Sequence, residues 1–141
     1  MIKIRIKSSM SNIKSGANVI LVKGNKILLM KRSLGWKTGS WGPAGGHIDP
    51  GETPKQAAVR ETFEEAGLRT KESDLELLVQ RTKSDFGTIY YFITDKFTGN
   101  GVALSHEHSA FTWANWEKIQ SLDTTFEPDV LLLIKSRLLS E

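Results

Sequence analysis

The sequence contains no cysteine, which excludes both a disulfide framework and a thiolate metal site. It also lacks any apolar run near the roughly 20 residues that a membrane-spanning helix needs. Residues 1–7 alternate isoleucine with lysine or arginine, so they lack the unbroken apolar segment of a secretory signal peptide. These absences predict a cytoplasmic protein with no membrane partner.

Acidic residues are missing from the first third of the chain. Residues 1–48 hold nine Lys or Arg and no Asp or Glu, whereas residues 49–141 hold ten basic and sixteen acidic residues. A basic segment beside an acidic one suits a ligand that carries phosphates, because the basic part attracts the anion. The alternative is that most of these lysines are solvent-facing strand residues, as the alternation in residues 2–7 indicates.

Residues 54–66 are predicted to form a helix with well-defined ends. Thr53 is a good N-cap, Pro54 suits the first helical position, and Gln56 completes a capping box with Thr53. Gly67 can adopt the left-handed conformation that ends a helix. The boundaries of this helix therefore follow from local sequence signals.

The two sides of the predicted helix differ in character. Four residues fall on the side that we expect to pack against the core: Val59, Thr62, Phe63 and Ala66. The other side carries Glu61, Glu64 and Glu65, and like charges at this spacing destabilise a helix by roughly 0.2–0.5 kcal/mol per pair. A cation with carboxylate ligands, Mg²⁺ or Mn²⁺, would offset the cluster. A solvated acidic face, with Arg60 paired to Glu64, is the alternative.

The spacing of charged residues and glycines around this helix resembles the Nudix box. Gly46, Glu52 and the run from Arg60 to Leu68 fit the family pattern G-x5-E-x7-R-E-U-x-E-E-x-G-U, in which U is a bulky aliphatic residue. Every fixed position of the pattern is present within residues 46–68. Thr62 stands where an aliphatic residue is usual, a departure that concerns packing rather than chemistry.

Nudix enzymes cleave a diphosphate linked to a nucleoside by attack of water on phosphorus. The resemblance implies a metal-dependent pyrophosphohydrolase that acts on a small nucleoside diphosphate derivative, with Mg²⁺ or Mn²⁺ as cofactor. It implies four metal-binding groups: the carboxylates of Glu61, Glu64 and Glu65 and the backbone carbonyl of Gly46. Arg60 would orient Glu61 or Glu64 in catalysis, and Glu52 would support the site from the loop.

Strand signals stand on both sides of the box helix. The predicted strands are residues 2–7, 17–22, 27–31, 75–81, 88–94 and 110–113, and the further predicted helices are 116–121 and 128–139. This order predicts helices packed on a mixed sheet. The Nudix resemblance makes the expected fold class more specific: a single domain over residues 1–141 with an α/β fold, an α/β/α sandwich around a mixed central sheet.

Three aromatic residues stand in or beside predicted loops: Trp36, Trp41 and Phe86. Stacking of a base on an aromatic side chain is worth roughly 1–3 kcal/mol in single-strand binding sites. We therefore expect the base or sugar of the substrate to lie near one of them. The alternative is that each aromatic ring covers an edge of the core.

A carboxylate outside the box completes the expected site. In the Nudix family a further metal ligand or base often comes from a loop well after the box helix, and Glu107 lies in such a loop. The run from Glu107 to Trp113 resembles the acid and aromatic strand that follows the box in many members. A surface glutamate between two solvated histidines is the alternative, and Asp95 and Glu117 are competing acids.

Three functions remain open at the level of sequence. The first is hydrolysis of a nucleoside triphosphate, ADP-ribose, a sugar nucleotide or a dinucleoside polyphosphate. The second is a regulatory module that binds nucleotides without cleaving them. Such a module would be indicated by loss of acidic residues from the Nudix box, and this sequence retains all of them. The third is hydrolysis at the 5′ end of RNA, which only the basic first third suggests. No RNA-binding motif supports it.

Overall fold

A computed structural model of the chain describes residues 14–83 and 87–140. These residues form seven strands: β1 (Gly16–Lys23), β2 (Lys26–Arg32), β3 (Trp41–Gly42), β4 (Ala44–His47), β5 (Glu76–Lys83), β6 (Gly87–Thr94) and β7 (His108–Ala114). The helices are α2 (Pro54–Ala66), the short η1 (Glu72–Asp74), α3 (Trp116–Ser121) and α4 (Pro128–Leu139). The predicted strand at residues 2–7 lies outside the described residues, whereas the other predicted strands and helices are present. None of the helices in the described part of the chain is long and apolar enough to cross a membrane.

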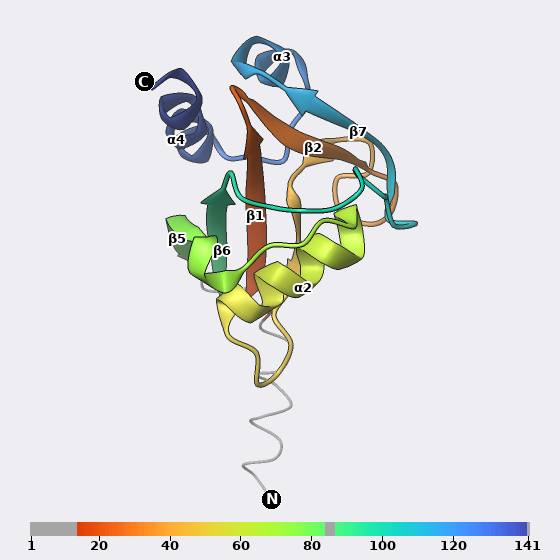
Figure 1. The fold of residues 1–141 in the computed structure, drawn as a ribbon, viewed down its shortest axis with the longest axis vertical. Helices are drawn as coiled ribbons and strands as arrows, with labels where there is room; N and C mark the ends of the chain where they lie inside the picture. The colour runs from red at the N-terminus through yellow and green to blue at the C-terminus, as the bar shows by residue number, and fades with distance from the viewer. Residues whose placement is uncertain (1–13, 84–86, 141) are drawn as a thin grey trace, which may run out of the picture.

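The strands form one mixed sheet in the order β3-β2-β1-β6-β5, with β4 paired to β1 and β7 paired to β2. The central strand β1 is parallel to β6 and antiparallel to β2 and β4. Strands β1 and β2 pair only near their turn, at Val22 with Ile27 and Lys23 with Lys26. Beyond that point β1 continues with β4 and β6, while β2 continues with β3 and β7 (Figure 1).

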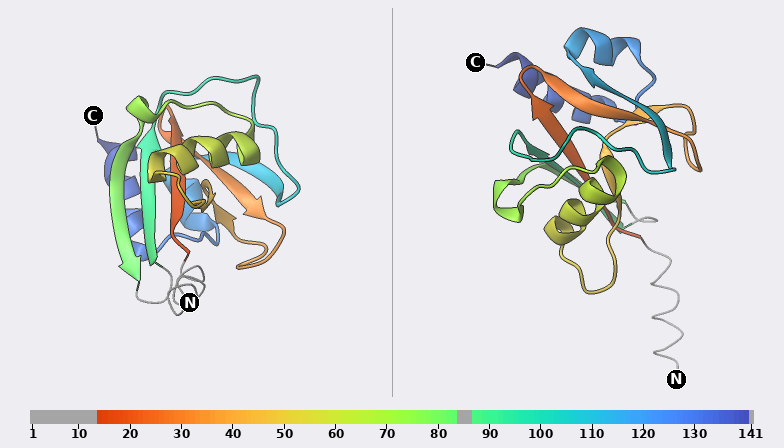
Figure 2. Two further views of the ribbon diagram at one scale, coloured as in Figure 1. Left: turned by 90° about the horizontal axis from the view of Figure 1, so that it is seen from below. Right: turned by 45° about the vertical axis from the view of Figure 1, so that its right-hand side comes forward.

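Alternating side chains of β1 divide the core into two layers, because successive residues of a strand point to opposite faces. Ala17, Val19 and Leu21 belong to the layer that packs against α2. Ile20 belongs to the layer that packs against α3 and α4. Figure 2 shows α2 and α4 on opposite sides of β1, β5 and β6. The predicted α/β/α arrangement with a mixed sheet is therefore confirmed.

Helix α2 begins and ends where the sequence predicts. The side chain of Thr53 accepts a hydrogen bond from the backbone N–H of Gln56, and the Gln56 side chain accepts one from the backbone N–H of Thr53. Gly67 has a φ of 73°, and its N–H donates to the carbonyl of Phe63. Local signals alone thus determine both ends of the helix.

The predicted orientation of α2 is wrong at two positions. Phe63 was expected in the core, but 44% of it is exposed, and it lies beneath the guanidinium of Arg69. Glu65 was expected on the polar face, but only 6% of it is exposed. The physical reason is that α2 packs through the small side chains of Ala57, Ala58 and Ala66, which allow a close approach to the sheet. This approach turns Glu65 toward β4.

Candidate active site

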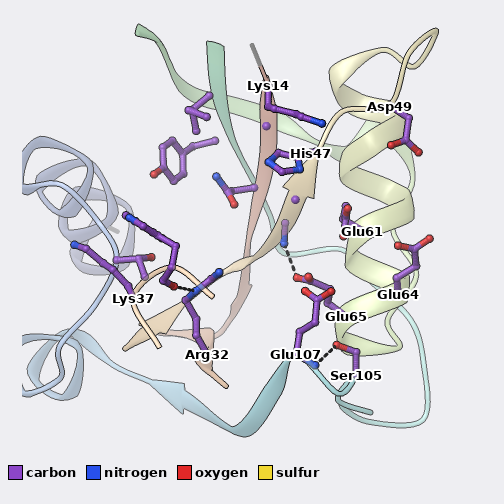
Figure 3. Close-up of a pocket in the computed structure, with 18 of the residues that line it drawn as sticks. Lys14, Arg32, Lys37, His47, Asp49, Glu61, Glu64, Glu65, Ser105 and Glu107 are labelled. Atoms are coloured by element: carbon purple, nitrogen blue, oxygen red, sulfur yellow. Dashed lines mark hydrogen bonds between the residues drawn. The ribbon is translucent and has the colours of Figure 1, made fainter. Parts of the chain in front are cut away.

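A cleft of about 1300 Å³ lies between α2, the free edge of β4 and the loops before β3 and β7. Acidic side chains from α2 and the two adjoining loops line one side: Asp49, Glu61, Glu64, Glu65 and Glu107. Five cationic side chains also line the cleft: Lys14, Arg32, Lys37, Arg81 and Lys83. In Figure 3 Arg32 and Lys37 stand across the cleft from the glutamates of α2. A negatively charged ligand could contact cations bound to the acidic side of the cleft and the cationic side chains on the other side.

Glu65 is the most deeply placed carboxylate of the acidic wall. It comes from the last turn of α2, and its Oε1 accepts a hydrogen bond from the N–H of Gly45, 3.0 Å away. The pKa of Glu65 is raised to about 8, chiefly by burial and also by the neighbouring carboxyls of Glu61 and Glu107, while the hydrogen bond from the Gly45 N–H opposes the rise. A carboxyl group in this environment holds its proton near neutral pH unless a cation offsets the charge.

Glu61 stands one turn before Glu65 on the same helix and faces Gly46. A β-carbon added at Gly46 would lie 2.6 Å from the Glu61 carboxyl carbon, so any other residue at this position would force the Glu61 carboxylate to move. Burial raises the pKa of the Glu61 carboxyl, and the nearby Glu64 and Glu107 raise it as well, whereas Arg60 lowers it. The close approach puts the Gly46 backbone beside the Glu61 carboxylate.

Arg60 holds the acidic wall together. Its Nε and Nη2 donate to the two carboxylate oxygens of Glu52 at 2.7 and 2.9 Å. Its Nη1 donates to Glu61 at 3.2 Å and to Glu64 at 3.1 Å, and Nη2 also donates to the carbonyl of His47. The hydrogen bonds from Arg60 lower the pKa of Glu52 to about 2. The planar guanidinium fork thus fixes three carboxylates at once, which a lysine could not do.

Glu107 reaches the acidic wall from the loop before β7. Its backbone carbonyl accepts a hydrogen bond from the N–H of Ser33 at 2.9 Å, and the Ser33 hydroxyl donates to the carbonyl of His106 at 3.0 Å. On the other side, the N–H of Ser105 donates to the backbone carbonyl of Glu65 at 3.3 Å. The loop is therefore tied both to α2 and to the end of β2. The competing acids Asp95 and Glu117 are not among the residues that line the cleft.

Whether this wall suits a divalent cation depends on its donor atoms. In the described residues, no three His, Asp or Glu side chains already form a metal-binding group. The carboxylates of Glu61, Glu65 and Glu107 nevertheless converge closely enough to raise the pKa of Glu65. All three supply oxygen, the ligand atom that Mg²⁺ and Mn²⁺ prefer. Among the described residues, Arg60 forms an ion pair with Glu61 but not with Glu65 or Glu107. The residues present therefore fit such an ion.

Glu64 differs from the other acids of α2. Its side chain is 54% exposed and pairs with Arg60 at 3.1 Å. The pairing of Arg60 with Glu64 that we considered as the solvated alternative is thus present. Glu64 still lines the cleft, so it lies within the same acidic wall at its outer rim.

The three aromatic candidates have different positions. Trp36 lines the cleft and is 63% exposed, and its carbonyl accepts a hydrogen bond from Arg32 Nε at 2.6 Å. Lys37, the next residue, lies over the Trp36 ring with its Nζ 5.0 Å from the centroid. Trp41 instead packs against the core layer beneath α3 and α4. Phe86 lies outside the described residues.

Several residues that line the cleft, Asn18, Arg32 and Tyr91 among them, are not in the set of site residues predicted from the sequence. Asn18, in the apolar strand β1, and Arg32, at the end of β2, line the cleft together with Tyr91 of β6. Asn18 could have been found as a polar residue in an otherwise apolar run, and Arg32 as a cation four residues before Trp36. Tyr91 belongs to a run of three aromatic residues, and sequence alone does not indicate which of them faces the ligand.

Comparison with known proteins gives consistent matches. Residues 13–133 match the family model described as the NUDIX domain. The chain is 32% identical over 111 residues to an asymmetrical bis(5'-nucleosyl)-tetraphosphatase of Caenorhabditis elegans, covering 74% of this chain and 80% of that protein. It is 33% identical over 101 residues to a CTP pyrophosphohydrolase of Escherichia coli, covering 70% and 73%. A solved structure from a study of MutT from Aliivibrio salmonicida and Vibrio cholerae shares the fold, with a TM-score of 0.74 at 19% identity over 88% of this chain and 98% of that one.

Proposed function

This chain belongs to the NUDIX domain family, and we propose that it hydrolyses a nucleoside polyphosphate at a diphosphate linkage with Mg²⁺ or Mn²⁺ as cofactor. The observation that carries the proposal is the cleft itself, in which glutamates of α2 and Glu107 stand opposite Arg32 and Lys37. A chain of phosphates carries negative charge along its whole length. It can therefore contact bound cations at one end and the cationic side chains at the other.

Five groups would hold the metal: the carboxylates of Glu61, Glu64, Glu65 and Glu107 and the backbone carbonyl of Gly46. A divalent cation there would neutralise the phosphate oxygens and lower the pKa of the attacking water. Arg60 would keep Glu61 and Glu64 in place through charge-assisted hydrogen bonds. Glu52, which binds two nitrogens of Arg60, would hold that guanidinium in turn.

The reaction that we propose is a displacement at phosphorus. The oxygen of water forms a new bond to phosphorus while the bond from phosphorus to the bridging oxygen breaks. Glu107 accepts the proton that the water loses, because its carboxyl is not bound to Arg60 and it faces the same space as Glu65. The departing phosphate leaves with its negative charge facing Arg32 and Lys37.

The substrate that we propose first is a dinucleoside polyphosphate. Ligand pockets usually measure about 300–1,000 Å³, and the cleft, at about 1300 Å³, exceeds that range. The relative from Caenorhabditis elegans is named for a bis(5'-nucleosyl) tetraphosphate. The relative from Escherichia coli is named for CTP, which makes a nucleoside triphosphate the second candidate.

The test is a comparison of substrates with the purified chain. Diadenosine tetraphosphate, ATP, CTP, ADP-ribose and a sugar nucleotide are each incubated with Mg²⁺, and the products are separated by ion exchange. We expect diadenosine tetraphosphate to have the highest kcat/KM and EDTA to abolish the reaction. In water labelled with ¹⁸O, the label should enter one phosphate product. No metal-dependent turnover of any of the five would leave a nucleotide-binding module as the better account.

A further inference from the structure

Asn18 is an unusual residue in the central strand. Strand β1 is otherwise built of glycine, apolar residues and a terminal lysine, and asparagine is depleted in strands. Asn18 pairs with Gly45 on one side and with Tyr91 on the other. By alternation its side chain points to the same face as Ile20, away from α2. A polar residue here is inconsistent with the pattern of its strand, and such local inconsistencies are expected at functional sites.

Asn18 lines a small recess that adjoins the cleft. The recess has a volume of about 80 Å³, and Trp36, Tyr91 and Arg32 also line it. It is continuous with the main cleft, because these four residues line both spaces. No hydrogen bond joins the Asn18 carboxamide to another side chain or to the backbone of the described residues. Its donor and its acceptor are thus free for a ligand.

The backbone of β4 separates this recess from the acidic wall. A β-carbon on Gly45 would collide with the Asn18 Oδ1 and lie 2.8 Å from the Asn18 Cα, whereas one on Gly46 would collide with Glu61. The two successive glycines therefore let Asn18 and Glu61 pack directly against opposite faces of β4. One face meets the carboxylates that would bind the cation, and the other meets Asn18. A nucleotide whose phosphates lie along the β4 edge would bring its base to the recess.

We propose that Asn18 is a specificity-determining residue that hydrogen-bonds the edge of the substrate's nucleobase, while Trp36 and Tyr91 border the base. A carboxamide presents a donor and an acceptor side by side, as in the bidentate pairing of asparagine with adenine N6 and N7. The recess has room for the edge of a base only, so the rest of the ring lies in the main cleft. This inference rests on the proposed function, because it assumes a nucleotide in the cleft.

The variant Asn18→Asp tests the inference through a change of preference. A carboxylate offers two acceptors, which match the neighbouring N1–H and N2–H donors of guanine but not the ring acceptor of adenine. We expect the ratio of kcat/KM for GTP to that for ATP to rise by roughly tenfold, within the discrimination of a bidentate contact. Asn25→Asp is the matched control, since it makes the same charge change in the exposed turn after β1 and should leave the ratio unchanged.

A base-free substrate separates a base contact from a phosphate contact. Asn18→Ala should lower kcat/KM for ATP and GTP but leave tripolyphosphate hydrolysis within twofold of the parent. An equal loss on all three, or an unchanged GTP to ATP ratio in Asn18→Asp, would overturn the inference. Circular dichroism melting of each variant verifies that it is folded.

Binding without turnover keeps this test separate from the proposed function. Quenching of tryptophan fluorescence by AMP and GMP, without metal, reports occupancy of the recess beside Trp36. We expect Asn18→Asp to weaken AMP binding relative to GMP, and equal effects on both would count against a base contact. If the parent binds AMP but cleaves no nucleotide, the proposed hydrolysis fails while the base contact stands.

Discussion

The carboxyl groups of Glu65 and Glu107 lie beside each other on the acidic wall of the cleft, although one belongs to helix α2 and the other to the loop before β7, and the Glu107 carboxyl contributes to the raised pKa of Glu65 (Figure 3). Two adjacent carboxyl groups can share a hydrogen bond only when one of them is protonated. The pair is therefore a place where a proton and a divalent cation compete, because metal ligands of this kind must be deprotonated. The first three predictions concern this pair.

Replacing Glu107 by glutamine should impair catalysis and leave the fold intact. The change removes a carboxylate that faces the cleft without altering its size, so we expect kcat to fall at least about tenfold, which corresponds to about 1.4 kcal/mol of barrier. Glu117→Gln in α3, outside the cleft, is the control. A kcat within twofold of the parent across pH 6–9 would remove Glu107 from the mechanism.

Glu65→Gln should fold and lose most activity, even at saturating Mg²⁺. Glutamine keeps an oxygen that can accept the bond from the Gly45 N–H, so the local backbone should be preserved. It cannot supply the negative charge that a Mg²⁺ ligand provides. Turnover is compared with that of the control Glu72→Gln, which changes an exposed glutamate. Equal rates in the parent and in Glu65→Gln would contradict the proposal that Glu65 is a metal ligand.

Stability of the metal-free protein should fall as pH rises from about 4.5 to about 8. Over this range the unfolded chain ionises Glu65 while the folded chain holds its proton, because the folded pKa is about 8. The folded state then binds more protons than the unfolded state, so the free energy of unfolding decreases with pH. Urea titrations at pH 5 and pH 8 measure the difference.

The same linkage predicts how Mg²⁺ acts. Because the ion displaces the proton, its stabilising effect should be larger at pH 8 than at pH 5. Glu65→Gln should show a smaller loss of stability between the two pH values than the parent does. If Mg²⁺ stabilises the parent protein equally at pH 5 and at pH 8, the ion does not compete with the proton on Glu65.

Phe63→Ala should have a small effect on stability, in contrast to a truncation in the core. Phe63 is 44% exposed, so we expect well under the roughly 3–5 kcal/mol that a buried phenylalanine costs. Leu28→Ala, at a fully buried position, should cost roughly 2–5 kcal/mol. Thermal melting of the two variants measures the difference. A larger loss of stability for Phe63→Ala than for Leu28→Ala would show that Phe63 is buried and would contradict this orientation of α2.

Trp36→Ala and Trp41→Ala should have different effects. Trp36 is exposed in the cleft, so its loss should raise KM for nucleotides several-fold with little change in melting temperature. Trp41 packs against the core layer beneath α3 and α4, so its loss should lower the melting temperature first. If KM is unchanged in both variants, the nucleotide is recognised by another surface of the protein.

The sequence by itself determined the elements whose signals are local. The ends of α2 depend on Thr53, Pro54 and Gly67, which act on the backbone within one turn of themselves. The hairpin of β1 and β2 and helices α3 and α4 follow from short apolar patterns in the same way. The family resemblance depends on fixed spacing along the chain, so it too could be recognised without a structure.

Tertiary structure alone decided which side of α2 is buried and what meets it. Three alanines give the helix a small-residue face that the hydrophobic pattern understates, and the close packing they allow turned Glu65 inward and Phe63 outward. The contact of Glu65 with Glu107, and that of Asn18 with Gly45, join segments far apart in sequence. Such contacts depend on how the sheet pairs and how closely the layers approach, and no local signal carries that information.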